Sequence, residues 1–239
     1  MRLPLRHAVR LHKLVGLVVG LQILFWTGSG LFFTIFPIEQ VRGNHLRTTI
    51  DHGVLNLNVE ILPAGIAASR IGVSPTRAEL RMFLGEAVWQ FETPEDAVMV
   101  DAQSGVLRSP ITSEEAAAIA KRGLTDTAGT AEKPFLLSEA PPREYRGSLP
   151  AWVISHEPGN VRAYIDASTG RIVSVRTPVW RAFDVLWRFH IMDVTGDDKF
   201  HPWWLRIFAF LAVTMALTGL IILLDRIAKG RFLRWKMLM

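Results

Sequence analysis

The 239-residue chain contains no cysteine, which excludes disulfide bonds, thiolate catalysis and every cysteine-based metal or iron–sulfur site. It also lacks an HExxH zinc motif, a phosphate-binding loop and a GxGxxG dinucleotide motif. No Ser/His/Asp grouping is recognisable by motif either. The seven histidines are therefore the candidate ligands for a metal or a haem iron, and we do not expect catalysis by the central part of the chain.

Charge is absent from two long stretches. Residues 14–37 hold no Asp, Glu, Lys or Arg across 24 positions, and residues 207–224 form a second uncharged run of 18. At 1.5 Å per residue these runs reach about 36 and 27 Å, against a hydrocarbon core of about 30 Å. We expect transmembrane helices at 14–37 and 203–224. The first is expected to be an uncleaved signal anchor, because it exceeds a signal-peptide core and no A-x-A site follows.

Acidic residues are nearly absent from the two membrane flanks, residues 1–13 and 225–239. Their charged residues are Arg2, Arg6, Arg10, Lys13, Asp225, Arg226, Lys229, Arg231, Arg234 and Lys236. The positive-inside rule then predicts two cytoplasmic termini and a periplasmic central segment in a bacterial inner membrane. Residues 38–202 carry 17 basic and 21 acidic residues, so the pI of about 10.0 comes from the flanks. It favours contact with anionic lipid and not with nucleic acid.

The central segment contains an internal repeat. Residues 98–107 and 163–172 each consist of an apolar run, the sequence Asp-Ala-x-[Ser/Thr]-Gly and a second apolar run. This pattern predicts a β-hairpin, in which Asp101 or Asp166 caps the turn and Gly105 or Gly170 takes a positive φ. The 65-residue spacing is the size of a small α+β unit.

The segments that precede each hairpin also match. Residues 63–70 and 112–121 are helix candidates, and residues 88–92 and 151–155 alternate like strands. The expected fold is an α+β extracytoplasmic domain of two tandem units, 38–110 and 111–178. Each unit combines a helix with an antiparallel sheet, and the domain is held between the two transmembrane helices.

Several of these segments resemble a known family. "VDAQSG" at 100–105 and "YIDASTG" at 164–170 are similar to the end of a PepSY domain. Residues 10–33 resemble the first helix of PepSY-associated transmembrane proteins, and residues 185–193 and 205–224 resemble the second. The resemblance implies a role in envelope iron and haem metabolism, including ferric-siderophore reduction in longer, four-helix members. For other PepSY proteins it implies protease inhibition or propeptide-like action.

Residues 179–202 predict an amphipathic helix and a turn at the outer membrane interface. One side of this helix carries Trp180, Phe183, Trp187, His190 and Ile191. From the residues alone, His190 is an interfacial anchor and His12 is a helix-end histidine at the headgroup level. The family resemblance instead implies that both are haem b ligands. We expect His201 in a turn and His45, His52 and His156 in solvated loops.

The depths of the histidines in the membrane limit the haem hypothesis. His12 lies at the inner end of the first span and His190 at the outer side, so the two cannot share one iron. Only His45 and His201 are expected near the level of His190. Four-helix relatives have a second pair of helices that this chain lacks, and a homodimer would restore four.

Small residues recur on both spans at spacings of three and four, which favours close helix packing. They are Gly16 and Gly20 in the first span and Ala212, Ala216 and Gly219 in the second. The simplest use is packing of the two spans on each other, with dimerisation as the second.

Two functions are compatible with the sequence. The preferred one is a non-enzymatic, membrane-anchored PepSY module that binds a periplasmic protein or peptide partner, accessory to iron or siderophore uptake or to envelope maintenance. The alternative is a haem b-binding transmembrane redox subunit or a ferric-siderophore reductase-like protein.

Overall fold

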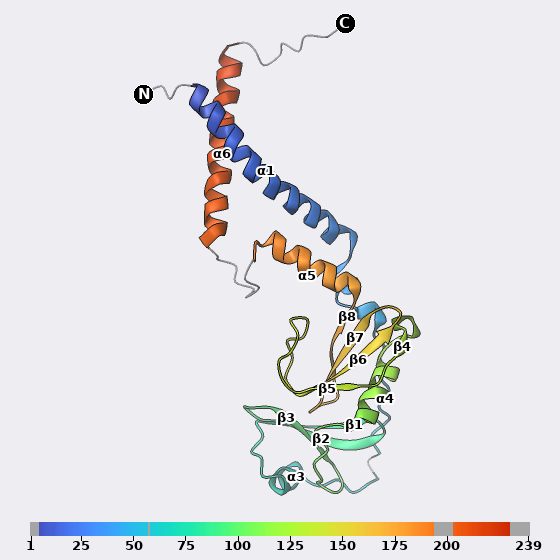
Figure 1. The fold of residues 1–239 in the computed structure, drawn as a ribbon. Coiled ribbons are helices and arrows are strands. Elements are labelled where there is room, and N and C mark those ends of the chain that lie inside the picture. Colours follow the sequence, from blue (N-terminus) through green and yellow to red (C-terminus); the bar gives the residue numbers. More distant parts are fainter. Residues whose placement is uncertain (1–4, 57, 194–202, 230–239) are drawn as a thin grey trace. The chain divides into compact units, whose positions relative to one another are not determined.

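The computed structural model describes residues 5–56, 58–193 and 203–229 of the chain. It divides into two compact units. One, here called the helical unit, contains the residues up to Phe36 and from Phe183 onward. The other, here called the sheet unit, contains Pro37–Ala182. Figure 1 shows the helices and strands of both.

Two long apolar helices dominate the helical unit. Helix α1 (Leu5–Ile35) has 31 residues and helix α6 (Trp203–Ala228) has 26. By length and composition, both can cross a membrane. Helix α1 begins nine residues before the predicted span at 14–37. Its basic first turns do not interrupt the helix, because Arg and Lys are good helix formers.

The α1–α6 contact uses one face of α1. Its buried apolar side chains are those of Ala8, Val15 and Val19, which recur at helical spacing and are 8, 7 and 4% exposed. A third helix, α5 (Pro178–His190), begins in the sheet unit and runs antiparallel to the second half of α1. Its Phe183 ring lies 4.7 Å from that of Phe33.

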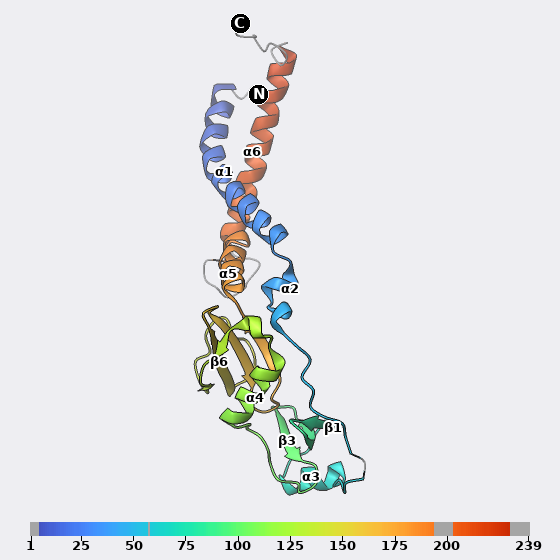
Figure 2. The same cartoon turned by 90° about the vertical axis from the view of Figure 1, so that its right-hand side faces the viewer.

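The sheet unit contains two antiparallel sheets. The unit begins with helix α2 (Ile38–Val41), a 3-10 turn η1 (Asn44–Leu46) and helix α3 (Ala64–Arg70). The first sheet follows and contains, in this order, β1 (Arg77–Phe83), β2 (Glu86–Glu92) and β3 (Ala97–Asp101). Helix α4 (Ser113–Gly123) and a 3-10 turn η2 (Asp126–Ala128) follow. The second sheet contains β4 (Thr130–Ala131), β5 (Phe135–Leu137), β6 (Ala151–Glu157), β7 (Val161–Asp166) and β8 (Ile172–Arg176). Its order is β4-β6-β7-β8, and β5 also pairs with β6. Figure 2 shows α4 against the second sheet.

The two repeated turns have the same geometry. Gly105 and Gly170 have φ of 71° and 70°. Each glycine donates its N–H to the backbone oxygen of the aspartate four residues earlier, Asp101 or Asp166, at 2.9 and 2.8 Å. In both turns the residue before the glycine donates its N–H to the same aspartate Oδ1 at 2.7 Å. The aspartates therefore cap the turns, and the glycines supply a backbone conformation that other residues adopt at a cost.

The strands that return from these turns differ. After Gly170 the chain forms β8, five residues long. After Gly105 it forms only a single bridge, between Val100 and Leu107. Pro110 follows soon after and has no N–H to donate to a ladder. The hairpin expected at residues 98–107 is consequently much shorter than its counterpart.

The two halves of the sheet unit share one core. Phe83, Val88 and Met99 of the first sheet pack in the same buried cluster as Ile154 and Ile165 of the second. Ile111 and three residues of helix α4, including Ile119, complete this cluster. Residues 38–110 and 111–178 therefore fold as one body, although each repeats the other's local pattern.

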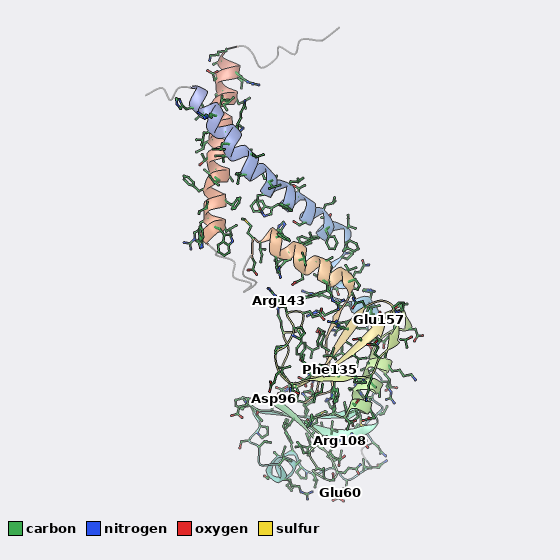
Figure 3. The ribbon with its side chains drawn as sticks, viewed as in Figure 1. Glu60, Asp96, Arg108, Phe135, Arg143 and Glu157 are labelled. Carbon is green, nitrogen blue, oxygen red and sulfur yellow. The ribbon has the colours of Figure 1, made fainter. Side chains whose placement is uncertain are left out.

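Polar contacts hold α4 in place within that body. Thr112 and Glu115 form a capping box at its start, within the helix predicted at 112–121. Arg108, labelled in Figure 3, forms ion pairs with Glu115 at 2.6 Å and with Glu86 of β2 at 2.9 Å. These contacts join the end of the first half to the beginning of the second.

Candidate functional site

His12 lies against α6. Its Nδ1 is 3.1 Å from the backbone oxygen of Met215 and 3.1 Å from Thr218 Oγ1. A Cβ atom at Gly219 would lie 3.1 Å from His12 Cε1, so the glycine leaves room for the ring. A carbonyl oxygen can only accept a hydrogen bond, which places the proton on Nδ1. The Nε2 atom of His12 then carries a free lone pair.

His190, the last residue of α5, is held in a similar way. Its Nδ1 lies 2.7 Å from Ser29 Oγ on α1. The Ser29 hydroxyl also lies 2.7 Å from the backbone oxygen of Phe25, and its single proton can go to that oxygen or to His190 Nδ1. The imidazole is parallel to the Trp187 ring, with centroids 6.1 Å apart, and meets Phe33 edge-on at 5.4 Å. Nδ1 of His190 is thus engaged by α1, and Nε2 is the other ring nitrogen.

These two histidines have the donor chemistry that haem iron requires, but they cannot serve one iron. His12 and Ser29, which holds His190, are 17 residues apart on α1, about 26 Å at 1.5 Å per residue. A bis-histidine haem would need a second histidine at each level. In the described part of the chain the other histidines are His7 on α1 and His45, His52 and His156 of the sheet unit. His201 lies outside the described residues.

Of the small residues expected to pack the two spans on each other, some face the other span and others do not. Gly16 faces Met215, whose Cε would lie 3.8 Å from a Cβ there, and Gly219 faces His12. Gly20 has open space in place of a Cβ. On α6, Ala212 is half-buried and Ala216 is exposed. The helical unit thus uses one glycine from each span.

A cavity of about 300 Å³ in the helical unit, with polar and apolar lining residues, was not expected from the sequence. It is lined by Gln22, Arg188, Phe189, Met192 and Asp193. The side-chain nitrogen of Gln22 and Nε of Arg188 are buried without a hydrogen-bond partner. No local pattern predicts this cavity, because Gln22 is a single uncharged polar residue inside an apolar run.

The sheet unit contains a basic cleft of about 350 Å³. It is lined by Arg47, Thr48, Ile50, His52, Arg81, Gly123, Gly170, Arg171 and Ile172, and we call it the arginine cleft. Its floor is apolar: a Cβ at Gly123 would meet Ile172 Cδ1 at 2.5 Å and Ile50 Cδ1 at 2.9 Å. The cations come from the segment after η1, from β1 and from the turn before β8, so no local motif in the sequence could reveal them.

Electrostatic repulsion within the arginine cleft perturbs its groups. Burial lowers the pKa of the Arg81 guanidinium, and the neighbouring Arg171 lowers it further. Burial also lowers the pKa of His52, with additional contributions from Arg81 and Arg122. His52 is consequently neutral near pH 7.

The expectation of a solvated loop was wrong for His156, whereas His52 does lie in a loop but is only partly solvated. His52 is half-buried: its ring stacks on Phe83 at 6.0 Å, and its Nδ1 accepts the Leu84 N–H at 3.2 Å. His156 lies on β6 and is 3% exposed, because the strand continues to Glu157 and its alternation turns His156 inward. Burial lowers the pKa of His156. His45 is exposed in η1.

Two apolar helices long enough to cross a membrane, with a mixed α/β unit between them in sequence, define the class of two-span membrane proteins with one intervening domain. A family model described as "PepSY-associated TM region" matches residues 9–237, and the chain belongs to this family. The resemblance drawn from the sequence is confirmed. Comparison with curated proteins and with solved structures gave no match.

Proposed function

We propose that the protein is a two-pass inner-membrane protein with cytoplasmic termini, and that its sheet unit is a non-enzymatic binding module at the periplasmic face. Its partner would be a periplasmic protein or peptide. The family resemblance supports a role accessory to iron or siderophore uptake or to envelope maintenance. The basic flanks at 1–13 and 225–239 support the orientation.

The arginine cleft is the observation that carries the proposal. It combines an apolar floor with a few convergent polar groups, which is the usual composition of a ligand site. Its lining comes from both halves of the shared core, so the fold itself holds the groups in place. Arg47 and Arg81 are fixed there by hydrogen bonds to neighbouring strands and turns.

Photo-crosslinking in living cells tests the binding role. A benzoylphenylalanine placed at Thr48, exposed and lining the cleft, should give a discrete adduct with a partner. The same group at Gln103, exposed in the first turn and outside the cleft, is the matched control. The adduct should decrease when unmodified protein is co-expressed. Equal adducts from both positions, or none from Thr48, would contradict the proposal.

A second candidate, a haem b-binding redox subunit or ferric-siderophore reductase-like protein, is favoured by one observation. Both His12 and His190 have Nδ1 engaged by the neighbouring helix, which orients each ring and leaves Nε2 as a ligand atom. Haem bound at these histidines would supply one-electron transfer. A homodimer would bring a second copy of each histidine.

Haem content separates the two candidates. The pyridine haemochrome per protein is measured for the wild type, His12→Ala, His190→Ala and the control His45→Ala after expression in haem-replete cells. The redox function requires haem in the wild type and the control and a loss in at least one of the other variants. A wild type without haem excludes this function, and unchanged content in every variant excludes these ligands.

A further inference from the structure

Positive charge outweighs negative charge in the arginine cleft. Three guanidinium groups line it, and Arg122 is close enough to affect His52 electrostatically. Two carboxylates lie nearby. Glu79 Oε2 is 3.9 Å from an Arg171 nitrogen, and Asp51 Oδ1 accepts the Gly53 N–H at 2.8 Å. Neither acid lines the cleft itself, and no other carboxylate of the described residues does.

Two of the arginines are held by hydrogen bonds within the chain, and each still has N–H groups that these bonds do not use. Arg47 donates through its two Nη atoms to the backbone oxygens of Ile172 and Val173, while its buried Nε has no hydrogen-bond partner. Arg81 donates from Nε to Gln90 at 2.9 Å and from Nη2 to the backbone oxygen of Thr169 at 2.5 Å. These contacts fix both guanidinium planes before any ligand binds, which reduces the entropy lost on binding.

Arg171 and His52 complete the donor set. The Arg171 side chain is 57% exposed, and within the described residues its one ion pair is the long contact with Glu79. It can therefore turn toward a ligand at little cost. His52 accepts the Leu84 N–H through Nδ1, so its neutral ring carries the proton on Nε2 and is a donor there.

We propose that the arginine cleft binds the oxyanion groups, carboxylate or phosphate, of a ligand that fits about 350 Å³, with Arg47 and Arg81 as fixed cations and Arg171 as the exposed one. Guanidinium groups pair with such oxyanions through two parallel hydrogen bonds, and the geometry of an ammonium group does not allow this. An anion would also relieve the repulsion between Arg81 and Arg171. This inference deepens the proposed function and rests on the sheet unit being the binding module.

The test is isothermal titration of the full chain in a neutral detergent at low ionic strength. The probes are citrate, inorganic phosphate and a short peptide of alternating Glu and Gly with blocked ends. The variants are Arg171→Gln and the matched control Arg77→Gln. Both arginines are exposed and both pair with Glu79, at 3.9 and 3.7 Å, but only Arg171 lines the cleft.

At least one probe should bind the wild type with a stoichiometry near one. Arg171→Gln should weaken that binding about tenfold, the value of one lost charge-assisted hydrogen bond, and Arg77→Gln should change it less than about twofold. Preference for the peptide would identify a protein as the source of the oxyanion, and preference for citrate or phosphate a free small molecule.

Absence of saturable binding to the wild type, or equal weakening by both variants, would overturn the proposal and assign the arginines a structural role. The binding-module function is tested separately by the Thr48 crosslink. If the crosslink forms and no anion binds, only the anion proposal fails.

Discussion

Gly170→Ala should destabilise the sheet unit more than the same change at Gly105, although the two glycines occupy matching turns. Both have positive φ, 70° and 71°, so a Cβ at either costs about 1–2 kcal/mol of backbone strain. Part of this is offset, because alanine reduces the entropy of the unfolded chain relative to glycine by about 0.4–1 kcal/mol.

The difference in stability loss between the two variants comes from the atoms that surround each glycine. A Cβ at Gly170 would lie 2.5 Å from Phe83 Cε2, and Phe83 is fully buried in the shared core. A Cβ at Gly105 would lie 2.7 Å from Cδ of Arg70, an exposed side chain that can swing away. Overpacking a buried core costs about 1–3 kcal/mol. We expect losses of about 2–4 kcal/mol for Gly170→Ala and about 1 kcal/mol for Gly105→Ala.

Pulse proteolysis of the full chain across a urea gradient, in neutral detergent, measures these losses. With a slope of about 1–3 kcal/mol per M, Gly170→Ala should lower the unfolding midpoint of the sheet unit by about 1 M or more. Gly105→Ala should lower it by less than half as much. Equal shifts would refute the argument, because they would show that the contact with Phe83 adds nothing to the turn strain.

Two further predictions concern other parts of the chain. Burial raises the pKa of Glu144, but hydrogen bonds from Arg181, Tyr164 and Arg162 outweigh it and hold the pKa below its usual 4.5. The stabilisation is therefore present above about pH 4.5 and is lost as the pH falls through the folded value. In the same urea assay Glu144→Gln should lower the free energy of unfolding by about 1–3 kcal/mol at pH 7, and by less as the pH is lowered below 4. A loss that does not depend on pH would contradict this assignment. Gly219→Val should push the His12 ring from α6 and so reduce the yield of a disulfide between cysteines placed at positions 16 and 215. The control Ala216→Val, at an exposed position, should leave that yield unchanged. Equal yields in both variants would exclude close packing at Gly219.

The sequence predicted the features that depend on local pattern. Two uncharged runs predicted α1 and α6, and Asp-Ala-x-[Ser/Thr]-Gly predicted the positive φ found at Gly105 and Gly170. The helix predicted at 112–121 matches α4, because N-cap residues and acids in the first turn are short-range signals.

Features that depend on tertiary contacts could not be predicted in this way. The shared core joins Phe83 to Ile154 across 71 positions, and the arginine cleft joins Arg47 to Arg171 across more. His156 was expected in a loop because Pro158 and Gly159 follow it, yet β6 continues through it to Glu157. The pairing of His190 with Ser29 likewise depends on how α5 packs on α1.

The central claim is that the sheet unit is presented outside the cytoplasm by two membrane-spanning helices. The absence of cysteine allows a direct test by single-cysteine labelling with a membrane-impermeant maleimide, in intact cells whose outer membrane has been made permeable. Gln103→Cys reports the sheet unit, and Lys229→Cys, exposed just after α6, reports the C-terminal flank. We expect labelling at position 103 in intact cells, and at position 229 only after the inner membrane is opened. Labelling of position 229 in intact cells, with position 103 protected, would contradict it.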